Sequence, residues 1–146
     1  DRLEVVLSEH TAVARWADGR MLSDQGRLFA GSAAAGADLP LFEGPEERAG
    51  ELMAFHGLAR PVFLPLGLQV EVVRLSARGS WSLVLDDGTE IEAGRGDPQA
   101  RLARFARVLP QLRRDATRRL VRADLRYTNG FAVVWEDAVA DKEKNA

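Results

Sequence analysis

The residue types that could carry chemistry are few in this sequence, and they are not clustered. The histidines, His10 and His56, have no second potential ligand three or four positions further along, as a metal-binding pair on a helix would require. Cysteine is absent, which excludes thiol catalysis, disulfides and cysteine-based metal sites. We therefore expect no metal, no cofactor and no catalytic residue.

The segment Gly94-Arg95-Gly96-Asp97 resembles a phosphate-binding loop only superficially. It has neither the third glycine of a dinucleotide fingerprint nor the Gly-Lys-Ser/Thr of a P-loop. A turn from a strand into a helix, capped by Asp97, explains it better. Arg95 is unfavourably placed for the dipole of such a helix, so the pattern leaves open either plain solvent exposure or a contact with a partner.

Two charged clusters are also more typical of structure than of catalysis. Asp86 and Asp87 lie at the tip of a predicted hairpin, where aspartate favours the turn and no cleft surrounds it. The arginines between 113 and 122 are typical of a solvated helix end, with an acidic partner as the alternative. The formal net charge is −2, and aromatic residues are not interleaved with the arginines, so nothing indicates nucleic-acid binding.

Alternating apolar residues and turn residues predict short strands at 3–7, 13–16, 21–23, 27–29, 39–42, 68–75, 81–85 and 89–93. Two helices are expected to begin at Pro45 and at Asp97-Pro98, with Pro61 and Pro65 ending or resetting the first and Pro110 kinking or shortening the second. Their buried stripes are Leu52, Phe55, Leu58 and Ala59, and Leu102, Phe105, Leu109 and Leu112. These elements predict an α+β domain with a mainly antiparallel, curved sheet and two helices.

The segment 121–135 predicts a hairpin, because Asn129-Gly130 suits a tight type I′ turn between two strands. In the second strand Phe131, Val133 and Trp135 should face one way, and Ala132 and Val134 the other. No further strand pattern follows it, so this strand could form an open edge that accepts a partner strand beside Tyr127 and Trp135. The alternative, which the pattern alone favours, is a strand inside the sheet that completes the core.

Four stretches spread along the chain resemble the FtsQ/DivIB family of bacterial cell-division proteins. They are Ala12-Val13-Ala14-Arg15-Trp16, Leu22-Ser23-Asp24-Gln25-Gly26, Gly94-Arg95-Gly96-Asp97 with Arg101-Leu102-Ala103-Arg104-Phe105, and Ala123-Asp124-Leu125-Arg126-Tyr127 running to Gly130 and Trp135. The resemblance implies a cytoplasmic tail, one membrane-spanning helix, a periplasmic POTRA domain and a β-domain. It places the last POTRA strand at 1–11 and the β-domain at 12–137. The small and charged residues 138–146 are expected to form a flexible tail.

We expect the chain to be a piece of a longer protein, because it has no initiator Met and enters a strand pattern at once. It has no apolar run long enough to span a bilayer, so any membrane attachment would come from the parent protein's own anchor.

The same resemblance implies a non-enzymatic scaffold of the divisome, on the periplasmic side of the inner membrane at the septum. It implies binding of the FtsB–FtsL pair, chiefly FtsB, by strand addition at the last strand. Tyr127, Gly130 and Trp135 match contact positions, Arg95 matches a basic contact to an acidic stretch, and Arg126 and Asn129 are neighbours. Phe131 stands where relatives often carry a small residue, and it either packs inward or adds to the partner site. The predicted binding residues are Arg95, Arg126, Tyr127, Asn129, Gly130, Phe131, Ala132, Val133, Val134 and Trp135.

Two other functions remain possible from the sequence. A POTRA-type module of outer-membrane assembly or secretion would predict tandem POTRA repeats and a barrel, which this sequence does not contain. A small hydrolase or ligand-binding domain would need convergent polar groups, and Asp24, Asp97 and His56 are the candidates, although no spacing links them.

Overall fold

The structure is a computed structural model that describes residues 11–31 and 36–137. The strand predicted at 3–7 and the tail predicted at 138–146 lie outside the described residues. The proposed boundary between a POTRA strand and the β-domain therefore stays a prediction.

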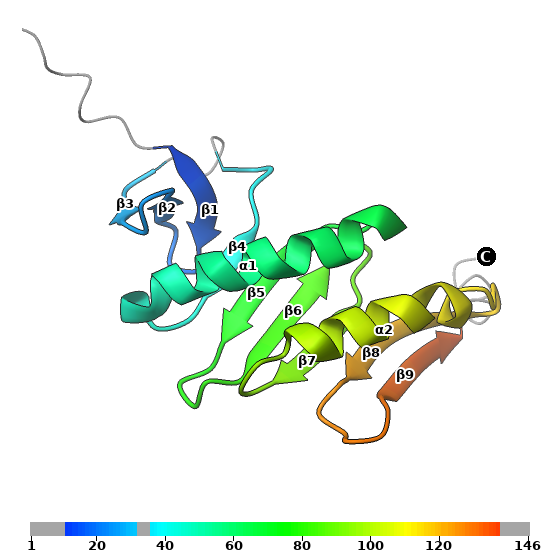
Figure 1. The fold of residues 1–146 in the computed structure, drawn as a ribbon. Helices are drawn as coiled ribbons and strands as arrows, with labels where there is room; N and C mark the ends of the chain where they lie inside the picture. The colour runs from blue at the N-terminus through cyan, green and yellow to red at the C-terminus, as the bar shows by residue number, and fades with distance from the viewer. Residues whose placement is uncertain (1–10, 32–35, 138–146) are drawn as a thin grey trace, which may run out of the picture.

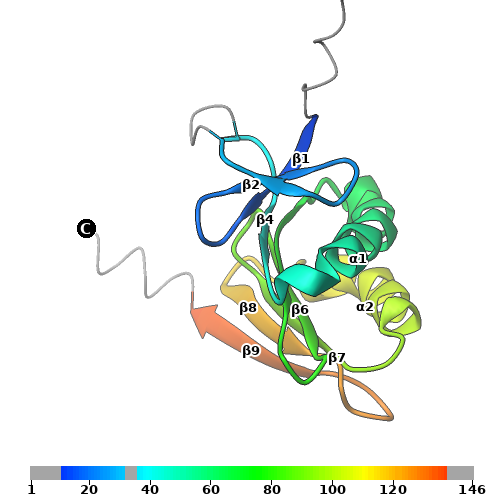
Figure 2. The same cartoon turned by 90° about the vertical axis from the view of Figure 1, so that its left-hand side faces the viewer.

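The described residues form one nine-stranded sheet in the order β3-β2-β1-β4-β5-β6-β7-β8-β9. The strands are β1 (Ala12–Trp16), β2 (Met21–Ser23), β3 (Leu28–Phe29), β4 (Leu41–Glu43), β5 (Val70–Leu75), β6 (Trp81–Leu85), β7 (Glu90–Gly94), β8 (Arg118–Asp124) and β9 (Ala132–Asp137). The helices are α1 (Ala49–Phe63) and α2 (Gln99–Leu112), with short 3₁₀ turns η2 (Glu46–Arg48) before α1 and η3 (Leu64–Leu66) after it. Both helices lie on the same face of the sheet (Figures 1 and 2).

The sheet is mixed, so the predicted α+β class is confirmed while the strand directions are less simple than expected. The pairs β1–β4, β4–β5 and β7–β8 are parallel, and the other pairs are antiparallel. The two helices explain two of the parallel pairs. Each carries the chain back along the sheet between consecutive strands, and such a crossover returns the next strand in the same direction.

The core lies between the helices and the sheet. Leu52, Phe55 and Ala59 of α1 are buried as predicted, and so are Leu102, Phe105 and Leu109 of α2. The prediction that Leu58 is buried was wrong, because 46% of its surface is exposed. It lies about 100° around the helix from Ala59, which takes it off the buried stripe. Phe63 continues that stripe instead and is fully buried.

The prolines do not end the helices where they stand. Pro61 lies inside α1, which continues to Phe63, and Pro110 lies inside α2, which continues to Leu112. A proline within a helix removes the hydrogen bond to the carbonyl four residues earlier. For Pro61 that carbonyl belongs to Gly57, and both residues are exposed, so water can replace the missing donor. Pro61 therefore does not end the first helix, but the predicted end or reset is found at Pro65, where α1 gives way to the 3₁₀ turn η3.

Candidate functional site

Strand β9 forms one edge of the sheet, and β8 is its only strand neighbour in the described part of the chain. Within residues 11–31 and 36–137, β9 is therefore an edge strand and not the interior strand of the alternative prediction. An edge strand leaves the N–H and C=O groups on its outer side without partners in the sheet. Figure 1 shows β9 as the last strand, beside β8 and far from β1–β3.

The connection between β8 and β9 is longer than the predicted two-residue turn. Asp124 pairs with Ala132, so residues 125–131 lie in the loop. Asn129 does not have the positive φ that a type I′ turn requires. Leu125 gives the reason: it is fully buried, and its N–H donates to the carbonyl of Glu92 in β7 at 2.9 Å. This contact holds the chain on β7 before it can turn back.

The side chains of β9 alternate between the two faces as predicted. Val133 and Trp135 are partly buried and pack against the core, whereas Ala132 is exposed and Val134 is 51% exposed. Phe131 precedes the strand and packs inward, its ring meeting that of Phe105 edge-on with centroids 5.4 Å apart. Phe131 therefore packs against α2 and is only partly buried, and its place in the predicted binding set stays a prediction.

Two arginines form cation–π contacts with the aromatic residues of this edge. The guanidinium of Arg104 lies 5.6 Å from the ring centroid of Phe131, and that of Arg118 lies 4.2 Å from that of Trp135. Such cation–π contacts stabilise an aromatic ring that is only partly buried. Sequence reasoning missed both arginines, because pairing them with these rings requires the strand register and the position of α2.

The loop 125–131 presents Tyr127 to solvent, with 57% of its surface exposed. Its neighbour Arg126 is engaged within the domain, since its Nε and terminal nitrogen donate to the Asp124 carboxylate at 2.9 and 2.7 Å. Those hydrogen bonds lower the pKa of Asp124 below its ordinary value. Asn129 is exposed and Gly130 is partly exposed. Tyr127 is therefore the large side chain of this loop that is most available to a partner.

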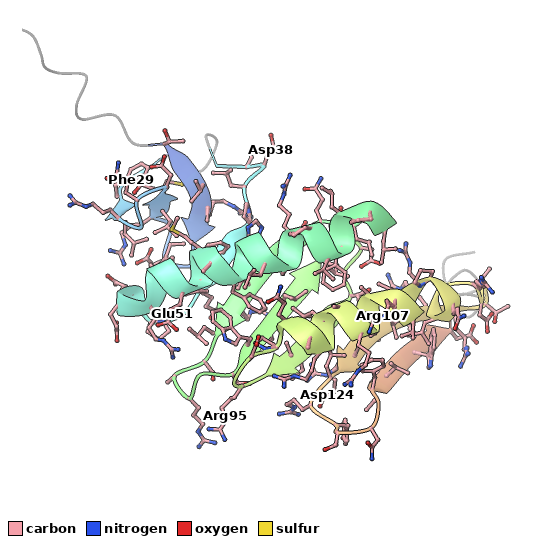
Figure 3. The ribbon with its side chains drawn as sticks, viewed as in Figure 1. Phe29, Asp38, Glu51, Arg95, Arg107 and Asp124 are labelled. Carbon is pink, nitrogen blue, oxygen red and sulfur yellow. The ribbon has the colours of Figure 1, made fainter. Side chains whose placement is uncertain are left out.

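The loop that carries Arg95 lies beside the start of the 125–131 loop. Strands β7 and β8 run parallel, so both end at the same side of the sheet, and Figure 3 shows Arg95 and Asp124 towards that end. A Cβ atom on Gly94 would lie only 2.9 Å from Cγ of Arg126, so the Arg126 side chain crosses directly over Gly94. The structure thus brings together two segments of the predicted site that are remote in sequence.

The backbone around Arg95 is held by Arg101, which donates to the carbonyls of Ala93 and Arg95 at 2.9 and 2.6 Å. The side chain of Arg95 is exposed and forms no ion pair with the described residues. Asp97 accepts a hydrogen bond from the N–H of Gln99 at 3.2 Å, but the N-cap of α2 is Pro98, one residue later than predicted, and no side chain caps the helix. The prediction of Asp97 as N-cap was therefore wrong. The turn interpretation of this segment is confirmed.

Asp24, Asp97 and His56, the residues that the sequence offered for a ligand-binding site, do not line one pocket. A pocket of about 650 Å³ is lined by His56 with Asp38 and Asp86, but neither Asp24 nor Asp97 contributes to it. Burial lowers the pKa of His56, and the nearby charge of Arg60 lowers it further. Asp86 instead accepts a hydrogen bond from the N–H of Gln69, just before β5, at 3.1 Å.

The described residues also lack a metal-binding cluster and a membrane-spanning helix. They contain no group of three or more His, Cys, Asp or Glu side chains placed to bind a metal ion. Neither of their helices combines the length and the apolar character needed to cross a bilayer.

Comparison with known proteins adds a second line of evidence. Residues 14–126 match the family model described as "Cell division protein FtsQ/DivIB, C-terminal", a match that includes Arg95 and β8 and stops before β9. A curated relative named "Cell division protein FtsQ" from Xanthomonas campestris is 52% identical over 134 residues, which are 91% of this chain and 48% of the relative.

Proteins with the same name from more distant bacteria match over a similar range. The relative from Nitrosospira multiformis is 36% identical over 89% of this chain and 54% of its own length. The relative from Escherichia coli is 32% identical over 92% of this chain and 51% of its own length. The chain thus spans about half the length of these relatives.

Proposed function

The chain belongs to the FtsQ/DivIB family of cell division proteins, and from that premise we propose that its domain is a non-enzymatic docking module of the division machinery. It takes up a strand of the FtsB–FtsL complex, chiefly of FtsB, along the outer side of β9. The parent protein is anchored in the inner membrane by one helix outside this chain and presents the domain on the periplasmic side at the septum. This activity needs no metal and no cofactor, because binding consists of backbone and side-chain contacts alone.

The observation that carries the proposal is the edge position of β9. A partner strand can continue the ladder there, so that affinity comes from main-chain hydrogen bonds and specificity from side chains at alternate positions. The strand is held firmly from its inner side, since Phe131 packs on Phe105 and Arg118 covers Trp135. A held edge loses less conformational entropy when a partner binds.

Side chains beside β9 support a specific partner. Val134 and Tyr127 are the exposed large apolar residues at this edge, and they offer contact area to an incoming strand. Arg95 follows the end of β7, which is separated from β9 by β8, and it has no ion pair among the described residues, so it is available to a carboxylate of the partner. Arg126 is a weaker candidate for a direct charge contact, because Asp124 already neutralises it.

Amide hydrogen exchange tests this function directly. Saturation with the periplasmic segment of FtsB should slow exchange of the outward-directed amides of β9 by at least about tenfold, because they become ladder donors. The opposite edge strand β3 is the internal control and should not change. Protection confined to other elements, with β9 unaffected, would contradict strand addition.

Charge reversal at Arg95 gives a second prediction. Arg95→Glu should weaken binding of the FtsB segment roughly tenfold at low salt, since attraction to an acidic stretch becomes repulsion. The loss should shrink as salt is raised, because the Debye length falls to about 3 Å at 1 M. Titration calorimetry at several salt concentrations measures this, with Arg27→Glu, which changes another exposed arginine, in the turn between β2 and β3, as the matched control. A loss that is independent of ionic strength would argue against a charge contact.

A further inference from the structure

The side of the domain formed by α1 and α2 carries a second candidate binding surface, separate from the β9 edge. A groove of about 420 Å³ runs between the two helices. It is lined by Val62 and Leu66 from the end of α1 and η3, and by Ala103, Ala106, Arg107 and Pro110 from α2. Figures 1 and 2 show the two helices side by side on the face of the sheet, with no other described element covering them.

The walls of this groove are apolar and basic, with no acidic residue. Neither the segment 52–69, which includes most of α1, nor the segment 98–114, which includes α2, contains Asp or Glu. Arg107 lines the groove, is exposed and forms no ion pair with the described residues (Figure 3). Arg113 and Arg114 follow at the end of α2, also exposed and without such a partner.

Three arginines of strands β5 and β8 are paired across the sheet. Arg74 contacts Glu43, Arg119 contacts Glu136, and Arg122 contacts Glu90, each between neighbouring strands of the sheet. These three arginines are neutralised within the sheet, whereas Arg107, Arg113 and Arg114 beside the helical groove have no ion pair among the described residues. Unpaired cations next to an apolar groove favour a ligand that brings both apolar side chains and negative charge.

We propose that the groove between α1 and α2 binds an acidic amphipathic helix of a partner protein, at a site separate from the β9 edge. Apolar side chains of that helix, spaced at i, i+3, i+4 and i+7, enter the groove over Val62, Leu66 and Ala106. Its flanking carboxylates lie beside Arg107 and the arginines at the end of α2. We assign the site to a helix because its apolar side chains line a shallow groove between two helices, the kind of surface that an amphipathic helix occupies.

The probe is a capped synthetic peptide of about 18 residues, long enough to form helix in isolation, with leucines at that spacing and glutamates on the flanking positions. Titrated into the whole chain labelled with ¹⁵N, it should shift the amide signals of Val62, Leu66, Ala103 and Ala106 saturably. Arg107→Glu should weaken binding at least about fivefold, most strongly at low salt. Arg78→Glu, an exposed and unpaired arginine in the turn between β5 and β6, is the control and should change nothing.

Each other outcome would overturn the proposal. A peptide of the same composition with scrambled order must bind more weakly, and equal binding would exclude a helix-specific site. No saturable shift up to about 1 mM peptide would exclude a useful affinity. Preferential binding to phosphatidylglycerol vesicles would assign the surface to the membrane instead. Tyr127→Ala must leave peptide binding unchanged, so failure here and failure at β9 can be told apart.

Discussion

Replacing Tyr127 with alanine is expected to lower the affinity of the domain for the FtsB periplasmic segment by about 30-fold, the loss typical of truncating an aromatic hot spot. Tyr127 is 57% exposed and makes no ring contact within the described residues, so its removal costs the free domain little. It lies in the loop that leads into β9. Titration calorimetry with the wild-type and variant domains measures the difference.

Leu64→Ala is the matched control, because Leu64 is another exposed large apolar residue, 42% exposed, and lies in η3 away from β9. Its affinity for FtsB should equal that of the wild type. Circular dichroism should show both variants folded. Unchanged affinity of the Tyr127 variant would contradict the edge-strand proposal.

Trp135→Ala is a less informative test of binding. Trp135 packs on the core and under Arg118, so its replacement also reduces the stability of the domain.

Replacing Phe105 with alanine should lower the free energy of unfolding by about 3–5 kcal/mol, the usual cost of deleting a fully buried aromatic side chain. Phe105 has no exposed surface and contacts the ring of Phe131 from α2. The loss is a large fraction of the roughly 5–15 kcal/mol that keeps a domain folded. It should also loosen the start of β9, because Phe131 loses its partner. Chemical denaturation of the whole chain gives the stability change.

The control for this prediction is Leu58→Ala on α1, which should change the free energy of unfolding by less than about 0.5 kcal/mol, as expected for a surface position. Leu58 is 46% exposed, although its place in the helical pattern predicted a buried side chain. A similar loss of unfolding free energy in both variants would mean that Phe105 is not more deeply buried than Leu58. A small loss for Phe105→Ala alone would mean that α2 contributes little to the core.

Local turns were predictable because their determinants are adjacent in sequence. The hairpin of β6 and β7 forms as expected, with Asp87 accepting a hydrogen bond from the N–H of Thr89 at 3.0 Å. The two-residue turn predicted at Asn129-Gly130 does not form. No local signal in the sequence reports that Leu125 is buried and hydrogen-bonded to Glu92. A contact between strands distant in sequence overrode the preference of two residues.

The sequence by itself determined the class of fold, the alternation along β9, the turn at Gly94 and the family to which the chain belongs. These depend on periodicity, on backbone preferences and on motifs, all of which lie within short segments. Only the tertiary structure decided that β9 is an edge, that Phe131 packs inward and that the Arg95 loop adjoins the loop before β9. Each of these depends on strand order or on contacts between distant segments. An alternating strand shows the same pattern at the edge of a sheet as inside it, because periodicity reports which side chains are buried and not which backbone groups are paired.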